Sequence, residues 1–171
     1  MTSARVLLAG LLLGTASAAH AQQPTLRDSL LDRFAGNWVL HGTIQGAPVT
    51  HDVSAEWVLA HQYVRMHETS RERDSTGAPE YEATVYIGWD PAAKQYACIW
   101  LDVFGGISAQ SVGRATPAGD RIAFVFGNAQ GQPGFQTTFI YDRATDRWSW
   151  EMDNIENGRP SPFARVALTR R

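Results

Sequence analysis

The side chains that could do chemistry gather on two stretches of the sequence. In "YVRMHETS" (63–70), Arg65 and His67 are two residues apart, and in "YACIWLD" (96–102), Asp102 follows Trp100 by two residues. Alternate residues of a strand share a face, so each pair would project to one side. An arginine and a histidine on one face would bind an anionic head group, and a carboxylate among aromatic rings would serve as a polar handle for a ligand.

The direction of each face decides whether these residues meet a ligand. The opposite face of 63–70 carries Val64 and Met66, and the more apolar set usually points into a core. If the other set points inward, Arg65 and His67 form a cationic patch; otherwise they are surface charges. Asp102 also has two interpretations, a ligand handle or an ordinary solvated carboxylate at the rim, because burying a carboxylate without a partner is costly.

Other reaction chemistries lack their usual residue spacing. The histidines occur in no H-E-x-x-H arrangement and no C-x-x-C occurs, so no metal site is predicted. There is no G-x-S-x-G, and Cys98 lies among apolar neighbours, where thiols are usually inert. No glycine-rich loop precedes a helix, so no phosphate site is predicted. An enzyme that uses Asp102, Arg65 and His67 stays an alternative, and it requires these side chains to converge.

The N-terminus has the pattern of an export signal. Arg5 precedes the apolar run Val6–Leu13, and small residues then end in Ala19-His20-Ala21. A bilayer span takes about 20 residues, so this run is too short to be one and instead fits a signal peptide with an A-x-A site. Cleavage after Ala21 would give a signal peptide over 1–21, a mature chain over 22–171, and a periplasmic or secreted location. No cysteine lies at that site to carry a lipid anchor.

The charge balance narrows the class of partner. Removing residues 1–21 takes away Arg5 alone, leaving 14 of the 15 basic residues against 17 acidic ones and a formal net charge of −3. A mildly acidic chain without a basic stripe is not typical of nucleic-acid binding.

The length of the chain fits a single domain. The 171 residues fit one domain, since single domains commonly run to roughly 100–200 residues. Cys98 is the only cysteine, so stability must come from a core rather than a disulfide.

The elements that must position these residues read mostly as strands. The stretch "TLRDSLLDRF" (25–34) predicts one short helix, capped by Thr25 and with an apolar stripe of Leu26, Leu30, Leu31 and Phe34. Ten segments rich in β-branched and aromatic residues follow it, separated by turn residues. The ten segments are Asn37–Ile44, Thr50–Leu59, Tyr63–Arg71, Glu80–Trp89, Gln95–Phe104, Ala109–Ala115, Arg121–Gly127, Phe135–Asp142, Arg147–Asn154 and Phe163–Thr169.

The connections between these segments predict an all-β fold. Asp90 and Pro91 are typical turn residues, since the carboxylate accepts backbone N–H groups and proline fixes φ. Short connections favour antiparallel neighbours, and no helical pattern long enough for a parallel crossover follows Phe34. Ten short antiparallel strands hide their edges in a two-sheet sandwich or in a closed barrel. The period of the side chains does not choose between the two.

The stretch "FAGNW" (34–38) resembles the Gly-x-Trp motif of lipocalins and related calycin barrels. The motif places Gly36 and Trp38 at the start of the first strand. The resemblance implies an up-and-down antiparallel barrel of about ten strands. It also implies that Trp38 plugs the closed end beneath an arginine of the last strand, and Arg165 in "PFARVALTRR" is the matching residue.

A closer resemblance covers most of the mature chain. The stretches "GNWVLHGTI", "AEWVLAHQYVRMHE" and "IGWDPAAKQYACIWLDVFGG" resemble a family of uncharacterised small secreted bacterial proteins with a lipocalin-like domain. The chain departs from that family at "AHQ", where a glycine turn is usual. Nitrobindin-type haem barrels are more distant relatives, and their haem takes an axial histidine on a late strand. Every histidine here lies at or before His67, so haem is disfavoured and no cofactor is predicted.

The resemblance and the aromatic rows together favour a ligand-binding function. Trp148, Trp150 and Met152 alternate with polar residues, which predicts that their side chains point inward. We therefore expect the barrel to bind a small apolar or amphiphilic ligand, with a filled barrel that acts as an interaction module as the alternative. The predicted ligand-binding residues are Trp57, Arg65, His67, Trp100, Asp102, Phe126, Phe139, Trp150 and Met152. The predicted structural residues are Gly36, Trp38, Asp90 and Arg165.

Overall fold

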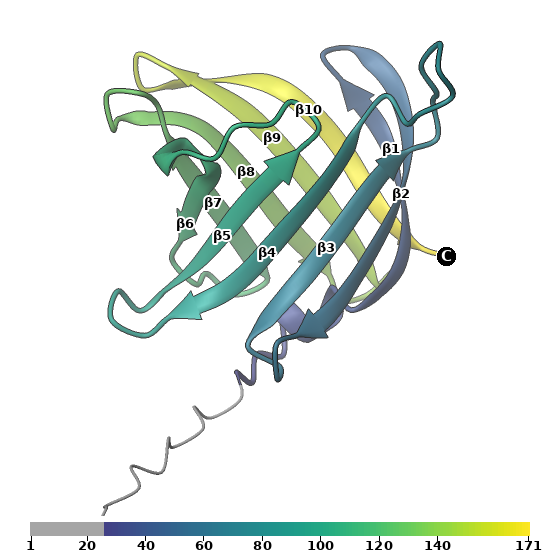
Figure 1. Ribbon diagram of the computed structural model, residues 1–171. Helices are drawn as coiled ribbons and strands as arrows, with labels where there is room; N and C mark the ends of the chain where they lie inside the picture. Colours follow the sequence, from purple (N-terminus) through teal and green to yellow (C-terminus); the bar gives the residue numbers. More distant parts are fainter. Residues whose placement is uncertain (1–25) are drawn as a thin grey trace, which may run out of the picture.

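The strands close into one antiparallel barrel in which each strand pairs with its neighbour in the chain and β1 pairs with β10 (Figure 1). The computed structural model describes residues 26–171, so the signal peptide predicted over 1–21 lies outside the described residues. The pairing of β1 with β10 excludes the open edges of a sandwich, and the predicted ten-stranded up-and-down barrel is confirmed. The strands are β1 (Gly36–Ile44), β2 (Ala47–Val58), β3 (Tyr63–Ser70), β4 (Glu82–Asp90), β5 (Gln95–Asp102), β6 (Val112–Ala115), β7 (Arg121–Gly127), β8 (Pro133–Asp142), β9 (Arg147–Glu156) and β10 (Arg159–Arg170).

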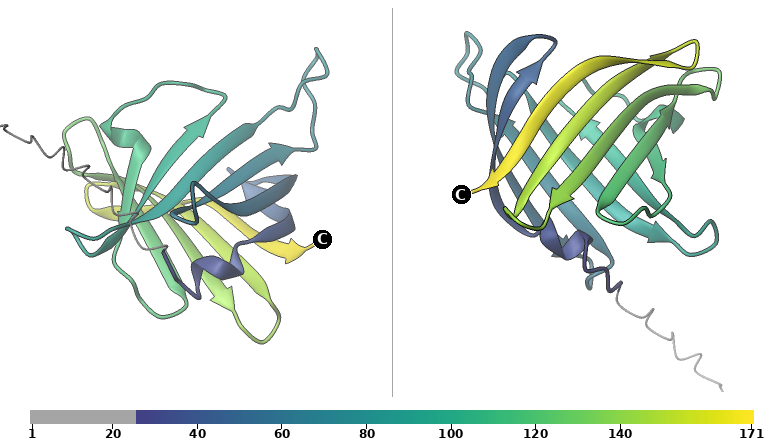
Figure 2. Two further views of the ribbon diagram at one scale, coloured as in Figure 1. Left: turned by 60° about the horizontal axis from the view of Figure 1, so that its bottom comes forward. Right: turned by 180° about the vertical axis from the view of Figure 1, so that it is seen from behind.

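The predicted N-terminal helix over 25–34 is wrong within the described residues. A single 3₁₀ turn, η1 (Leu31–Arg33), forms there instead, and the Asp28 carboxylate precedes it and accepts the N–H groups of Leu30 and Leu31. The apolar stripe is nevertheless buried, with Leu30, Leu31 and Phe34 in the core. The stripe therefore predicted a covered face correctly, although the element that presents it is a turn packed under the barrel (Figure 2).

Several strands differ from their predicted bounds at the end opposite η1, β6 and β10 among them. The residues 109–111 form a second 3₁₀ turn, η2 (Ala109–Ser111), so β6 is reduced to four residues. The last strand instead begins at Arg159 and pairs with β9 through a register shift between Pro162 and Ala164. The loop before β6 therefore lies at the rim of the barrel rather than in its wall.

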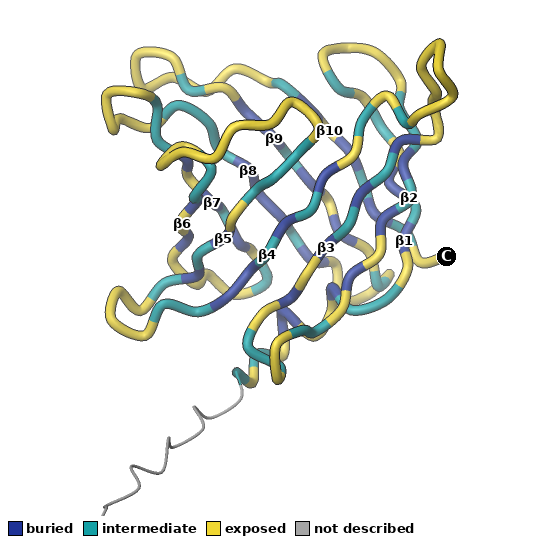
Figure 3. The backbone as a smooth tube through the Cα atoms, in the orientation of Figure 1, coloured by how far each residue is buried: buried dark blue, intermediate teal, exposed yellow. Residues whose placement is uncertain are grey.

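Burial alternates from residue to residue along most of the strands, and the core fills the half of the barrel nearest η1 (Figure 3). Phe34 stacks on Trp148 at 3.9 Å between ring centroids, and Phe139 lies 4.6 Å from Trp150. The Trp150 indole also donates a hydrogen bond of 2.5 Å to Thr137 Oγ1. These contacts seal one end of the barrel, which we call the closed end.

Arg170, and not the predicted Arg165, covers Trp38 at the closed end. The Arg170 guanidinium carbon lies 3.8 Å from the Trp38 ring centroid, and Trp38 Nε1 donates to Phe34 O at 2.7 Å. The strand register explains the correction, because Trp38 pairs with Arg170 whereas Arg165 pairs with Thr43. Arg165 faces outward and donates to Asp153 Oδ1 at 2.5 Å.

Gly36 is required at this site for two reasons. Its φ is +131°, a conformation that other residues rarely adopt. A Cβ atom at this position would also collide with Arg170 Nη1. The glycine therefore permits the guanidinium to reach Ala35 O at 2.7 Å and to cover the tryptophan.

Candidate functional site

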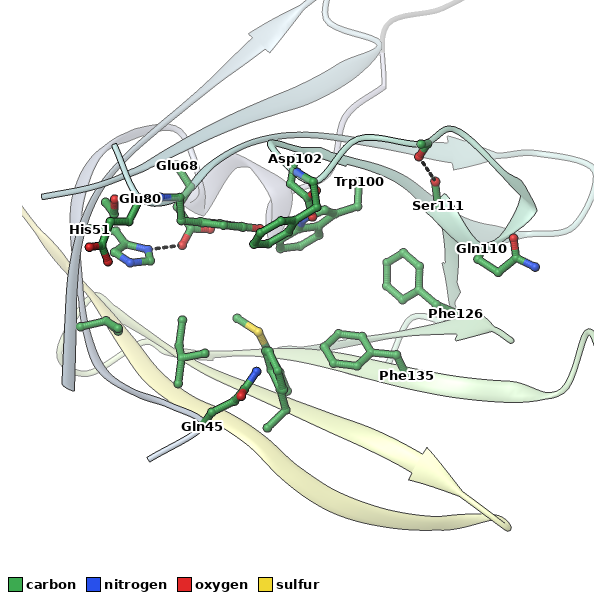
Figure 4. A pocket seen from close by; sticks show the side chains of 18 of the residues that line it. Gln45, His51, Glu68, Glu80, Trp100, Asp102, Gln110, Ser111, Phe126 and Phe135 are labelled. Atoms are coloured by element: carbon green, nitrogen blue, oxygen red, sulfur yellow. Dashed lines mark hydrogen bonds and ion pairs between the residues drawn. The ribbon is translucent and has the colours of Figure 1, made fainter. Parts of the chain in front are cut away.

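The open end of the barrel, opposite η1, encloses a cavity of about 1040 Å³. The first hairpin, the β3–β4 and β5–β6 loops, and the inner faces of β2, β3, β5 and β7–β10 form its walls (Figure 4). Ligand pockets in proteins commonly measure about 300–1,000 Å³, so this volume suits a small organic molecule. The lining includes Ile44, Val49, His51, Glu68, Ser70, Glu72, Glu80, Tyr81, Trp100, Asp102, Phe104, Phe126, Phe135, Met152 and Phe163.

The two sides of the cavity differ in polarity. Figure 4 shows His51, Glu68 and Asp102 along one side and Phe135 on the other. We call the side built from β2, β3, β5 and the β3–β4 loop the polar wall and the side built from β7–β10 the apolar wall. The rings of Phe126 and Phe135 lie 6.3 Å apart on the apolar wall in an edge-to-face contact.

A buried contact between a histidine and a carboxylate lies at the base of the polar wall. His51 Nδ1 and Glu68 Oε1 are 2.5 Å apart, and each residue is only 3% exposed. This contact leaves His51 Nε2 and the second Glu68 oxygen without a hydrogen-bond partner in the described part of the chain. No side-chain polar atom that is fully buried there lacks a partner, so both of these atoms reach the cavity. They can bind a polar group of a ligand.

Aromatic residues hold the rest of the polar wall in place. Trp100 Nε1 donates a hydrogen bond of 3.1 Å to the Tyr81 hydroxyl oxygen, which fixes both rings. Burial raises the pKa of Tyr81, and the negative charge of Glu68 raises it further, so the hydroxyl stays protonated at neutral pH. Asp102 Oδ1 accepts the Phe104 N–H at 3.0 Å, which holds this carboxylate at the rim.

Four of the nine predicted ligand-binding residues line the cavity, namely Trp100, Asp102, Phe126 and Met152. The Phe126 ring packs over Gly113, where a Cβ atom would lie 2.6 Å from the ring. This glycine gives the ring room against the wall.

Three other predicted residues point inward without reaching the cavity. Phe139 and Trp150 are fully buried beneath it, and Trp57 lies at the closed end. The Trp57 indole donates to Asp32 Oδ1 at 2.9 Å and stacks on His61 at 4.0 Å. These rings fill the lower half of the barrel and build the floor of the cavity.

Arg65 and His67 lie on the outer face of the barrel, so they form no cationic patch in the cavity. Arg65 pairs with Glu56, and His67 Nε2 lies 2.7 Å from Glu82 Oε1, both on the outside. The apolar set of β3, which includes Val64 and Met66, points inward instead, because its burial stabilises the core. The enzyme alternative that required Arg65, His67 and Asp102 to converge is therefore wrong.

Asp90 makes the turn that the sequence predicted. Its Oδ1 atom accepts the N–H groups of Ala92 and Ala93 at 3.1 and 3.0 Å, and its Oδ2 atom accepts from Arg114 at 2.9 Å. These bonds lower the pKa of Asp90, the backbone bond from Ala93 most of all. The residue is structural and lies at the closed end, away from the cavity.

The sequence prediction missed the polar residues that matter most in the cavity. His51 shares the inner face of β2 with Val53 and Ala55, and Glu68 shares that of β3 with Val64 and Met66. A polar residue that continues an apolar alternation toward one end of a strand is the signal that would have found both. Tyr81 precedes β4 in a loop, and no such pattern marks it.

No protein-family model and no curated protein matches the chain. Within residues 26–171, no group of three or more His, Cys, Asp or Glu side chains is placed to hold a metal ion. No helix in this described range is long and apolar enough to cross a membrane.

Proposed function

We propose that the protein is an exported binding protein that takes up a small amphiphilic molecule in the open half of its barrel. The observation that supports this most is the cavity of about 1040 Å³, which has one apolar wall and one polar wall. Apolar ligand surface buried against Phe126, Phe135 and Met152 would contribute about 25 cal/mol per Å². His51 and Glu68 would orient the polar end of the ligand.

The lipocalin-like resemblance supports the same proposal. The Gly36, Trp38 and Arg170 arrangement at the closed end is the one that the resemblance implies, with Arg170 in the arginine position. Lipocalin-like barrels bind apolar ligands at the opposite, open end. The alternative of an interaction module expects a filled interior, and the cavity argues against it.

A displacement assay with a neutral apolar dye tests this function. We expect the mature chain to bind N-phenyl-1-naphthylamine saturably at one site, and lipid, aromatic or haem-like competitors to displace it. Val49→Trp places a large ring in the cavity and should weaken dye binding at least about tenfold, whereas Val125→Trp on the outer face of β7 should not. Absence of saturable binding, or equal binding by Val49→Trp, would overturn the proposal.

A further inference from the structure

We propose that the ligand is an organic cation, whose ammonium group lies against the polar wall and whose hydrocarbon body lies on the apolar wall. This inference rests on the proposed function and adds the charge of the ligand to it. Three features carry it: the charge of the cavity lining, the burial of Glu68, and the aromatic rings beside the carboxylates.

The lining of the cavity is strongly acidic. Four carboxylates line it, those of Glu68, Glu72, Glu80 and Asp102, against the single imidazole of His51. No lysine or arginine of the described residues lines the cavity. Even a protonated His51 would leave the carboxylates in excess by three. A cavity of one sign concentrates ligands of the opposite sign, so this one attracts cations and repels fatty acids.

The buried Glu68 carboxylate can interact with a cation at the base of the cavity. Its carboxylate is buried, and His51 satisfies only the Oε1 atom. A buried carboxylate is costly unless its oxygens are paired. A ligand ammonium group near the second oxygen would offset its negative charge and displace water from it, and an ammonium group that carries N–H would also donate a hydrogen bond to it.

Aromatic rings beside these carboxylates favour an organic cation. The Tyr81 and Trp100 side chains are joined by their hydrogen bond, and the Tyr81 ring lies 6.1 Å from that of Phe104. The faces of such rings attract cations that have shed their water, which an alkylammonium does easily. Metal ions prefer three or more close oxygen, nitrogen or sulfur ligands, and no such group exists within residues 26–171.

The apolar wall favours a hydrocarbon body for the rest of the ligand. Phe135 contacts Phe163 at 5.7 Å between centroids, and Met152 lines the cavity beside them. Phe135 lies across the cavity from His51 and Glu68 (Figure 4). An alkyl or aryl body attached to the ammonium group would therefore bury its surface on this wall.

A matched ligand series tests the charge. Dodecyltrimethylammonium, dodecanol and dodecanoate share one hydrocarbon chain and are compared, below micelle-forming concentrations, by displacement of N-phenyl-1-naphthylamine. We expect the ammonium compound to bind about tenfold more tightly than dodecanol, and dodecanoate to bind most weakly. Glu68→Gln with Asp102→Asn should remove most of this preference, whereas Glu56→Gln on the outer face should leave it unchanged.

The outcomes separate the two proposals. Equal binding of the three compounds, tightest binding of dodecanoate, or an unchanged preference in the double variant would overturn the cation inference alone. Failure of the wild type to bind the neutral dye and all three compounds would overturn the proposed function. If the double variant misfolds, the salt dependence of binding by the wild type is measured instead. Raising the ionic strength from about 0.02 to 0.5 M should weaken binding of the ammonium compound and leave binding of dodecanol unchanged. An equal effect of salt on both compounds would overturn the cation inference.

Discussion

His51 Nδ1 lies 2.5 Å from Glu68 Oε1, at the level where the filled half of the barrel gives way to the cavity. The next inward residues toward the closed end are Val53 on β2 and Met66 on β3, both buried. Both side chains are therefore buried with the core, while His51 Nε2 and the second Glu68 oxygen face the cavity. It connects the stability of the barrel to the proposed binding site.

The first prediction concerns the energetics of this pair. His51→Phe should lower the free energy of unfolding by about 1–3 kcal/mol, because it leaves a buried carboxylate without its hydrogen-bond partner. Adding Glu68→Met to the same chain should recover part of that loss, since an apolar pair needs no partner. Urea unfolding of the two single variants and the double variant measures this. Strictly additive losses would show that the two side chains do not interact.

The second prediction concerns the closed end. Arg170→Ala should lower the free energy of unfolding by about 1–2 kcal/mol, because it removes the guanidinium over Trp38 and its bond to Ala35 O. Arg159→Ala, at the exposed other end of β10, is the control and should change stability by less than about 0.5 kcal/mol. Equal effects of the two substitutions, measured by urea unfolding, would contradict the assigned role of Arg170.

A third prediction follows from the pKa of Asp146. Bonds from Arg170 and from the Tyr141 hydroxyl lower that pKa below its ordinary value of 3.8. A carboxyl with a lowered pKa in the folded state contributes stability above pH 3.8 and loses it as the pH falls through the folded pKa. Asp146→Asn should therefore flatten the decline in melting temperature below about pH 4 relative to the wild type. An unchanged acid profile would refute this, and Glu156→Gln at the exposed end of β9 is the control.

The fourth prediction concerns the thiol of Cys98. Burial raises its pKa to about 12, so the group is a protonated thiol at pH 8. Since the thiolate is the reactive form, the folded protein should resist an aromatic disulfide reagent at pH 8 and react only after unfolding in urea. Absorbance of the released thiol measures the reaction. Rapid reaction of the folded protein would show that β5 opens at this position.

Most of the fold was predictable because strand signals are local. Turn residues such as Asp90 and the alternation of Trp148, Trp150 and Met152 predicted the strand count and the inward face of β9 correctly. The N-terminal helix was wrong because the same apolar stripe is buried by a turn, and the spacing of Leu30, Leu31 and Phe34 does not distinguish the two.

The site was less predictable because it depends on register and on depth in the barrel. Arg170 rather than Arg165 covers Trp38, and only the β1–β10 pairing decides which of the two does so. Phe139 and Phe126 both point inward, yet one fills the floor and the other lines the cavity, since they lie at different heights. Sequence alternation gives the face of a strand residue and not its height.

A crystal structure of the mature protein with dodecyltrimethylammonium would test both the binding cavity and the position of the charged group within it. We expect the hydrocarbon chain to lie along Phe126 and Phe135, with the ammonium group beside Glu68 or Asp102 and within about 6 Å of the Trp100 or Tyr81 ring centroid. A ligand bound only on the outer face of the barrel, or with its charged group against the apolar wall, would contradict the account.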